Sequence, residues 1–180
     1  MTTATKTLWK IDPMHSEVQF KVKHLVISTV TGSFDSFEGT IETEGDDFRD
    51  AKATFIADID SITTNNEDRD QHLKSDDFFN AEAYPQLRFE STNFEKVGDG
   101  RYKVTGELTI RDITREIELD VVHGGTVGDQ YGQTKAGFEI EGSINRKEFG
   151  LTWSAVTEAG NVVVGDEIKL HLNVQFIKNG

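Results

Sequence analysis

The feature of this sequence that most constrains its fold is a period-two alternation of apolar and polar residues, repeated along most of its 180 residues. Residues 16–24 show the pattern clearly, because one face is apolar up to its last position: Val18, Phe20, Val22 and His24. The residues between them are polar or charged: Glu17, Gln19, Lys21 and Lys23. Because successive side chains of a β-strand point to opposite faces, this alternation predicts strands with one buried face and one wet face.

Eight segments carry this pattern after a short lead-in strand at 8–11: residues 16–24, 34–44, 51–60, 87–95, 102–110, 117–121, 136–144 and 168–176. Gly32 is expected to interrupt the chain between the first two of them. Such strands must either stack as two sheets or close into a barrel. Since short turns join most of them, we predict a single all-β domain over residues 1–180, an extended eight-stranded antiparallel barrel. The interior of such a barrel is either filled by side chains or holds one small ligand.

Residues 65–85 depart from the alternation. Asn66 is a good N-cap, and Glu67 and Asp68 suit the positive end of a helix dipole. Leu73 is the only aliphatic residue between positions 67 and 77, which is too little for a helix with a core of its own. We therefore predict one short helix that caps an opening of the barrel, held by apolar side chains: Leu73, Phe78, Phe79 and Tyr84.

The composition limits the partners of the protein. Lys and Arg number 19 and Asp and Glu number 32, and the resulting net charge of −13 repels nucleic acid phosphates and anionic lipid surfaces. The absence of cysteine excludes thiol catalysis, thiolate metal sites and disulfides. No apolar run approaches the ~20 residues that span a bilayer, and the first residues lack a secretory hydrophobic segment. We expect no nucleic acid partner, no stable membrane insertion and a cytoplasmic location, or a periplasmic one if a leader has been removed.

The inward faces of the predicted strands supply the candidate ligand-binding residues: Phe20, Val22, His24, Phe37, Phe55, Ile59, Phe89, Leu108, Phe138, Ile140, Leu170, Leu172 and Val174. Several inward positions are small, among them Gly39, Gly106 and Gly142. Either they leave room for an apolar guest, or they mark bends whose gaps are filled by large neighbours. A vacant lumen of this composition would be lined by carbon, and its ligand would be long and apolar. Burying about ten methylene groups contributes about 8 kcal/mol, against an association cost of ~4 kcal/mol or more.

Polar residues on the predicted helix form the densest cluster that could carry chemistry. Arg69, Asp70 and His72 could hold a ligand head group, act as acid and base, or clamp the helix to the barrel rim. Arg146 could bind a phosphate head group or the carbonyls of an irregular loop. The candidates for a head-group site or lid are Arg69, His72, Phe78, Phe79 and Arg146. Metalloprotease, hydrolase, phosphate-loop and dinucleotide patterns are absent, so we predict no metal site, cofactor or catalytic residue.

Several motifs stand out along the chain: Asp12-Pro13-x-His15-Ser16-x-Val18, Arg69-Asp70-x-His72-Leu73-x-Ser75, Asp77-Phe78-Phe79, Tyr84-Pro85, Gly106-x-Leu108-Thr109-Ile110, Asn145-Arg146-x-x-Phe149-Gly150 and Val164-Gly165-Asp166. Together they resemble the YceI-like family of bacterial polyisoprenoid-binding proteins, from about Trp9 to Phe176. The resemblance implies a lipocalin-like barrel, an elongated apolar tunnel for a polyisoprenoid or similar amphiphile, and often a homodimer. Family members are commonly periplasmic, and this sequence differs from them in lacking a signal peptide.

The pattern and the resemblance predict a non-enzymatic protein that binds, stores or transports a long apolar ligand in the barrel lumen. The ligand classes are a polyisoprenoid, a prenyl quinone or a fatty-acid-like amphiphile. Two alternatives stay open. One is an enzyme that modifies an isoprenoid or lipid with Asp70 and His72. The other is a ligand-free structural or stress-response module whose lumen is filled by its own side chains.

Overall fold

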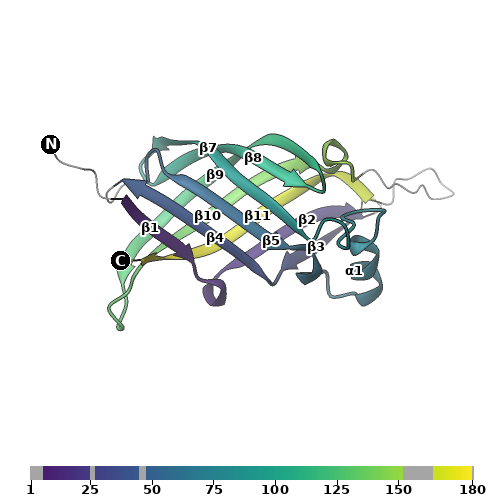
Figure 1. The fold of residues 1–180 in the computed structure, drawn as a ribbon, viewed down its shortest axis with the longest axis horizontal. Helices are drawn as coiled ribbons and strands as arrows, with labels where there is room; N and C mark the ends of the chain where they lie inside the picture. The colour runs from purple at the N-terminus through teal and green to yellow at the C-terminus, as the bar shows by residue number, and fades with distance from the viewer. Residues whose placement is uncertain (1–5, 25–26, 45–47, 152–163, 180) are drawn as a thin grey trace.

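The computed structural model describes residues 6–24, 27–44, 48–151 and 164–179 (Figure 1). Its strands are β1 (Lys6–Ile11), β2 (Glu17–His24), β3 (Ser28–Phe34), β4 (Phe37–Glu44), β5 (Lys52–Asp58), β6 (Ile62–Thr63), β7 (Gln86–Gly98), β8 (Arg101–Ile110), β9 (Ile113–Gly128), β10 (Thr134–Asn145) and β11 (Val164–Asn179). The helix α1 (Glu67–Lys74) is accompanied by three short 3-10 helices: η1 (Pro13–His15), η2 (Ile59–Ser61) and η3 (Arg146–Phe149). Within the described residues, no helix combines the length and hydropathy needed to cross a membrane.

The strands form one closed antiparallel barrel that has eight strands when interrupted strands are counted once. Three strands are interrupted in this way: η1 separates β1 from β2, a bend at Asp35 and Ser36 separates β3 from β4, and η2 separates β5 from β6. β11 pairs first with β2 and then with β1, and this pairing closes the sheet on itself. The strands are tilted and form an elongated barrel (Figure 1).

Gly32 does not interrupt the chain, contrary to our prediction from the sequence. It lies inside β3 and faces Phe20 of β2 across the ladder. A Cβ at this position would overlap the Phe20 ring, so the glycine is there because the ring lies over it. The break comes later, at Asp35 and Ser36, between β3 and β4.

The described chain starts and finishes at one end of the barrel (Figure 1), and aromatic side chains pack together there. The ring of Phe48 lies 5.3 Å from that of Trp9, 4.9 Å from Phe138 and 5.1 Å from His123, measured between centroids. Phe48 is only 2% exposed. We call Trp9, Phe48, His123 and Phe138 the aromatic plug. Rings at these distances pack against one another and contribute to the core at this end of the barrel.

The helix α1 lies at the opposite end of the barrel from the plug (Figure 1). Asn66 caps it as predicted, since its side chain accepts a hydrogen bond of 3.1 Å from the backbone N–H of Arg69. Leu73 and Phe79 pack against the barrel core. The segment therefore covers the opening as the short capping helix that the sequence predicts.

Candidate functional site

A cavity of about 350 Å³ occupies the lumen between the aromatic plug and α1. Ten of the predicted ligand-binding residues line it: Phe20, Val22, Phe55, Phe89, Leu108, Phe138, Ile140, Leu170, Leu172 and Val174. Further apolar residues from the same inward faces complete the wall, including Val18, Val30, Phe34, Ile41, Ile117, Leu119, Ile144 and Ile168. The volume falls within the range of small-molecule sites, and the wall offers carbon rather than charge.

Two of the predicted residues lie elsewhere, and the side chain of a third is not among those described. Phe37 is buried and its ring centroid is 6.0 Å from that of Phe55, so it packs behind the cavity wall. Ile59 is buried in η2, outside the lining of the cavity. His24 ends β2, and its side chain lies outside the described residues. Alternation tells which residues face inward, but it does not tell where along the barrel axis the vacant part lies.

Glycines and large side chains are paired across neighbouring strands of the wall. A Cβ at Gly32 or Gly106 would overlap the ring of Phe20 or Phe89, respectively. Both readings of the small inward residues therefore apply in part. The large neighbours fill the space over these glycines, while a cavity remains elsewhere in the lumen.

Arg69 and Asp70 both hold Thr64, the residue that follows β6. The Arg69 guanidinium donates to Thr64 Oγ1 and to Thr64 O, each at 2.7 Å. The Asp70 carboxylate accepts hydrogen bonds from Thr64 N at 2.8 Å and from Thr64 Oγ1 at 2.6 Å. Of the roles open from the sequence, this arrangement is the clamp that ties the helix to the rim of the barrel.

His72 lines the cavity beside the clamp but bonds a different group. Its Nε2 lies 2.9 Å from Asp77 Oδ2, and its ring meets Phe78 edge-on with centroids 5.1 Å apart. Asp70 is bonded to Thr64 instead. The two residues that the enzymatic alternative would pair as acid and base therefore have separate hydrogen-bond partners.

Arg111 ties the segment after α1 to the barrel, and the sequence analysis did not find it. It lies in the β8–β9 turn with a φ of 57°. Its guanidinium donates to the carbonyls of Asp76 and Phe78 at 3.2 Å and to the Asp76 carboxylate at 3.0 Å. It also lies 5.6 Å from the ring centroid of Tyr84. The hydrogen bonds join positions more than thirty residues apart, so no local sequence pattern predicts them.

Arg146 is 1% exposed, lines the lumen cavity and binds carbonyls of the neighbouring loop. Its guanidinium donates to the carbonyls of Gly165 at 2.9 Å, Leu151 at 2.6 Å and Val164 at 3.3 Å. Burial lowers the pKa of Arg146, and Asp166 at 3.7 Å counters that shift. Because these carbonyls occupy its donors, the loop-fixing role describes Arg146 better than phosphate binding does.

The outer wall brings together three possible metal ligands that sequence spacing did not reveal. The side-chain ligand atoms of Glu139, Glu141 and His171 all lie within 4.8 Å of one another. Glu141 is opposite His171 in the β10–β11 ladder, and His171 Nε2 lies 3.1 Å from Glu139 Oε1. Cross-strand neighbours of this kind have no fixed spacing in the chain. The carboxylates are exposed and lie outside the lumen, away from the apolar cavity.

The fold and the cavity define a class of protein, a closed antiparallel barrel whose lumen is shaped to bind an apolar small molecule. Comparison with known proteins identifies the family. The YceI-like domain model matches residues 9–176. The UPF0312 protein of Staphylococcus aureus strain N315 is 36% identical over 171 residues, which cover 94% of this chain and 97% of that protein. The chain therefore belongs to the YceI-like family, as the motifs indicated.

Solved structures share the fold. BcnA of Burkholderia cenocepacia superposes with a TM-score of 0.80 at 21% identity, covering 92% of this chain and 98% of BcnA. A polyisoprenoid binding domain from Saccharophagus degradans superposes with a TM-score of 0.68 at 16% identity, covering 93% and 97%. At these identities the likeness concerns the fold alone. It confirms the predicted eight-stranded antiparallel barrel with one helix.

Proposed function

We propose that the protein binds a long apolar ligand in its lumen, as a carrier or store for a polyisoprenoid, a prenyl quinone or a fatty-acid-like amphiphile. The observation that carries the proposal is the apolar cavity of about 350 Å³ between the aromatic plug and α1. The fold that the chain shares with the polyisoprenoid binding domain from Saccharophagus degradans supports this class of ligand.

The polar residues around the cavity favour binding over catalysis. Arg69 and Asp70 are engaged with Thr64, and Arg146 is engaged with loop carbonyls. None of these three is held ready for a reacting group. Affinity then comes from burial of methylene groups, at about 0.8 kcal/mol each, and the selectivity concerns the length and branching of the chain.

The first experiment is extraction of the purified protein with organic solvent, followed by mass spectrometry of the extract. Titration with a fluorescent fatty alcohol and with a prenyl quinone then measures affinity. Leu172→Trp fills the lumen and is expected to weaken binding by about tenfold, equivalent to ~1.4 kcal/mol. Asn173→Trp is the matched control, because Asn173 is the exposed neighbour on the same strand. Equal affinity in the two variants, or no uptake of either ligand, would contradict the proposal.

The enzymatic alternative is tested on the same ligands. If Asp70 and His72 modified the ligand, incubation would yield a product and His72→Ala would abolish it while binding persisted. We expect no product from the wild type.

The homodimer that the resemblance implies stays a prediction, and light scattering of the purified protein measures it.

A further inference from the structure

The ladder between β9 and β10 ends before the two strands do. Pairing runs from Gly128 and Thr134 to Asp120 and Glu141. Beyond that point, residues 113–119 of β9 are paired only with β8, and residues 142–145 of β10 are paired only with β11. All of these residues are described. We call these two stretches, which are not paired with each other, the seam.

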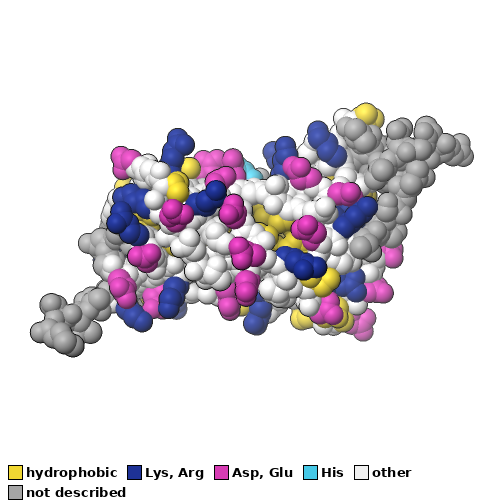
Figure 2. Space-filling view, turned by 90° about the horizontal axis from the view of Figure 1, so that it is seen from above, with side chains coloured by type: hydrophobic (Ala, Val, Ile, Leu, Met, Phe, Trp, Pro, Cys, Tyr) yellow, Lys and Arg dark blue, Asp and Glu magenta, His cyan; other side chains and the backbone are white. Residues whose placement is uncertain are grey.

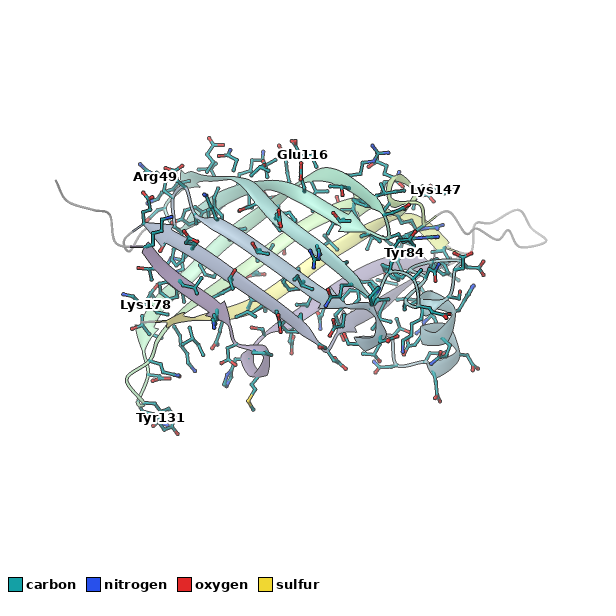
Figure 3. The ribbon with its side chains drawn as sticks, viewed as in Figure 1. Arg49, Tyr84, Glu116, Tyr131, Lys147 and Lys178 are labelled. Carbon is teal, nitrogen blue, oxygen red and sulfur yellow. The ribbon has the colours of Figure 1, made fainter. Side chains whose placement is uncertain are left out.

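An outer groove of about 1070 Å³ lies over the seam. Ile117, Ile144 and Leu170 line both this groove and the lumen cavity. A side chain that touches both spaces marks a place where the wall is one side chain thick. On this side of the barrel, where Glu116 of β9 points outward (Figure 3), hydrophobic side chains reach the surface between charged ones (Figure 2).

The seam is closed at Gly142 by the side chain of Leu119 and the backbone carbonyl of Glu118, and it is framed at both ends. The side chain of Leu119 covers Gly142, since a Cβ there would lie 2.6 Å from Leu119 Cδ2. The ladder at Asp120 bounds one end. At the other end Arg115 Nε donates to the carbonyl of Glu148 at 3.2 Å. The two strands are therefore held together at both ends of the seam and do not diverge.

More hydrogen bonds hold α1 and the segment behind it to the barrel than hold the two strands together along the seam. Raising α1 breaks the hydrogen bonds of Arg69 and Asp70 to Thr64, and raising the segment behind it breaks those of Arg111. Several of these bonds involve a charged group, which strengthens a hydrogen bond relative to a neutral pair. Parting the seam separates apolar side chains and breaks no ladder pair of the described strands. Of these two routes through the described residues, the seam requires fewer hydrogen bonds to be broken.

The outer groove carries an excess of negative charge. Seven carboxylates line it: Glu116, Glu118, Asp120, Glu141, Glu148, Asp166 and Glu167. Against them stand three lysines and one histidine: Lys21, Lys103, Lys169 and His171. An anionic head group is repelled by this surface, while an uncharged or cationic one is not.

We propose that the apolar ligand enters and leaves the lumen through the seam, and that its head group is uncharged or cationic and lies in the outer groove. This inference rests on the proposed function, because it concerns the path to the same cavity. It assigns α1 the role of a fixed cover.

The chain has no cysteine, so a pair introduced across the seam forms a unique cross-link. Glu118→Cys with Ser143→Cys places two exposed thiols at a register position just beyond the end of the ladder. Stopped-flow fluorescence measures association and dissociation of a pyrene-labelled dodecanol. We expect the oxidised protein to exchange this alcohol about tenfold more slowly than the reduced protein, with the effect on both rate constants. A short bismaleimide joins the same thiols if the disulfide does not form.

The matched control joins the same two strands inside the ladder, at Val122→Cys with Glu139→Cys. Its oxidation is expected to leave exchange unchanged. Equal rates in the oxidised and reduced seam variant would overturn the inference, and so would equal slowing in the control. No binding of the alcohol to the wild type would refute the proposed function instead.

For the head group, pyrene-labelled dodecanol should associate faster than the matching dodecanoate at low ionic strength, with a difference that salt reduces. Faster association of the carboxylate would overturn that part.

Discussion

At the scale of single residues, glycines of the barrel wall face large side chains on the neighbouring strands. Phe89 lies over Gly106, and Phe20 lies over Gly32. In each pair the ring occupies the volume that a side chain on the neighbouring strand would need. Protein interiors are close-packed, so a ring displaced from the wall has to enter the cavity.

Gly106→Ala tests this arrangement. The added methyl group overlaps Phe89 and backbone atoms of Glu90, so we expect a loss of about 1–3 kcal/mol of stability and weaker ligand binding as the ring turns inward. Urea unfolding and ligand titration measure the two effects. Gly137→Ala is the control, because nothing lies within 4 Å of a Cβ there. Unchanged binding in Gly106→Ala would show that the ring finds another place in the wall.

At the scale of elements, α1 is held by polar contacts more than by a core. An isolated helix of eight residues is not stable in water. Leu73 is its only aliphatic side chain, and Arg69 and Asp70 fasten its first turn to Thr64. Arg111 fastens the segment that follows from a different part of the barrel. The cover is therefore fixed at two separate points.

Arg111→Ala is expected to release the second point. It removes three hydrogen bonds and leaves carbonyls of the cover without their donor, at a cost of about 1–3 kcal/mol. Amide hydrogen exchange should rise in residues 76–84 and stay slow in β7 to β11. Arg88→Ala, at an exposed position on β7, is the control. Equal protection of residues 76–84 in both variants would contradict the role given to Arg111.

At the scale of the whole molecule, the barrel is polarised along its axis. The aromatic plug fills one end, α1 covers the other, and the vacancy lies between them. His123 packs against Phe48 and Phe138 within the plug. Burial lowers the pKa of His123, although a hydrogen bond with the backbone of Gly125 opposes the shift. The packing of this end is therefore coupled to pH.

We expect the stability of the barrel to depend on pH through His123. The unfolded chain gains a proton on this residue near pH ~6.5, while the folded chain stays neutral to a lower pH. The contribution is therefore complete above about pH 6.5 and is lost as the pH falls below it. Urea unfolding of the wild type and of His123→Gln, between about pH 5 and 8, measures the difference. A wild-type slope that persists in His123→Gln would assign the effect to another group.

Local patterns determined the wall of the barrel. Alternation placed Phe20, Leu108 and Leu170 inward because the strand period is a property of each segment alone. Asn66 marked the start of α1 because an N-cap acts on the next turn of the same chain. The apolar character of the lumen, and with it the chemistry of a ligand, followed from the same alternation.

The tertiary structure decided what depends on register between distant segments. It placed Phe37 and Ile59 outside the lining of the cavity although both face inward in the sequence pattern, because position along the barrel axis is set by the packing of the whole barrel. It also brought Arg111 to the cover and ended the β9–β10 ladder at Asp120. Such contacts join residues far apart in the chain, and only packing of the whole barrel brings them together. The sequence by itself therefore determined what the lumen is made of, and the folded barrel decided where it is vacant and where its wall can open.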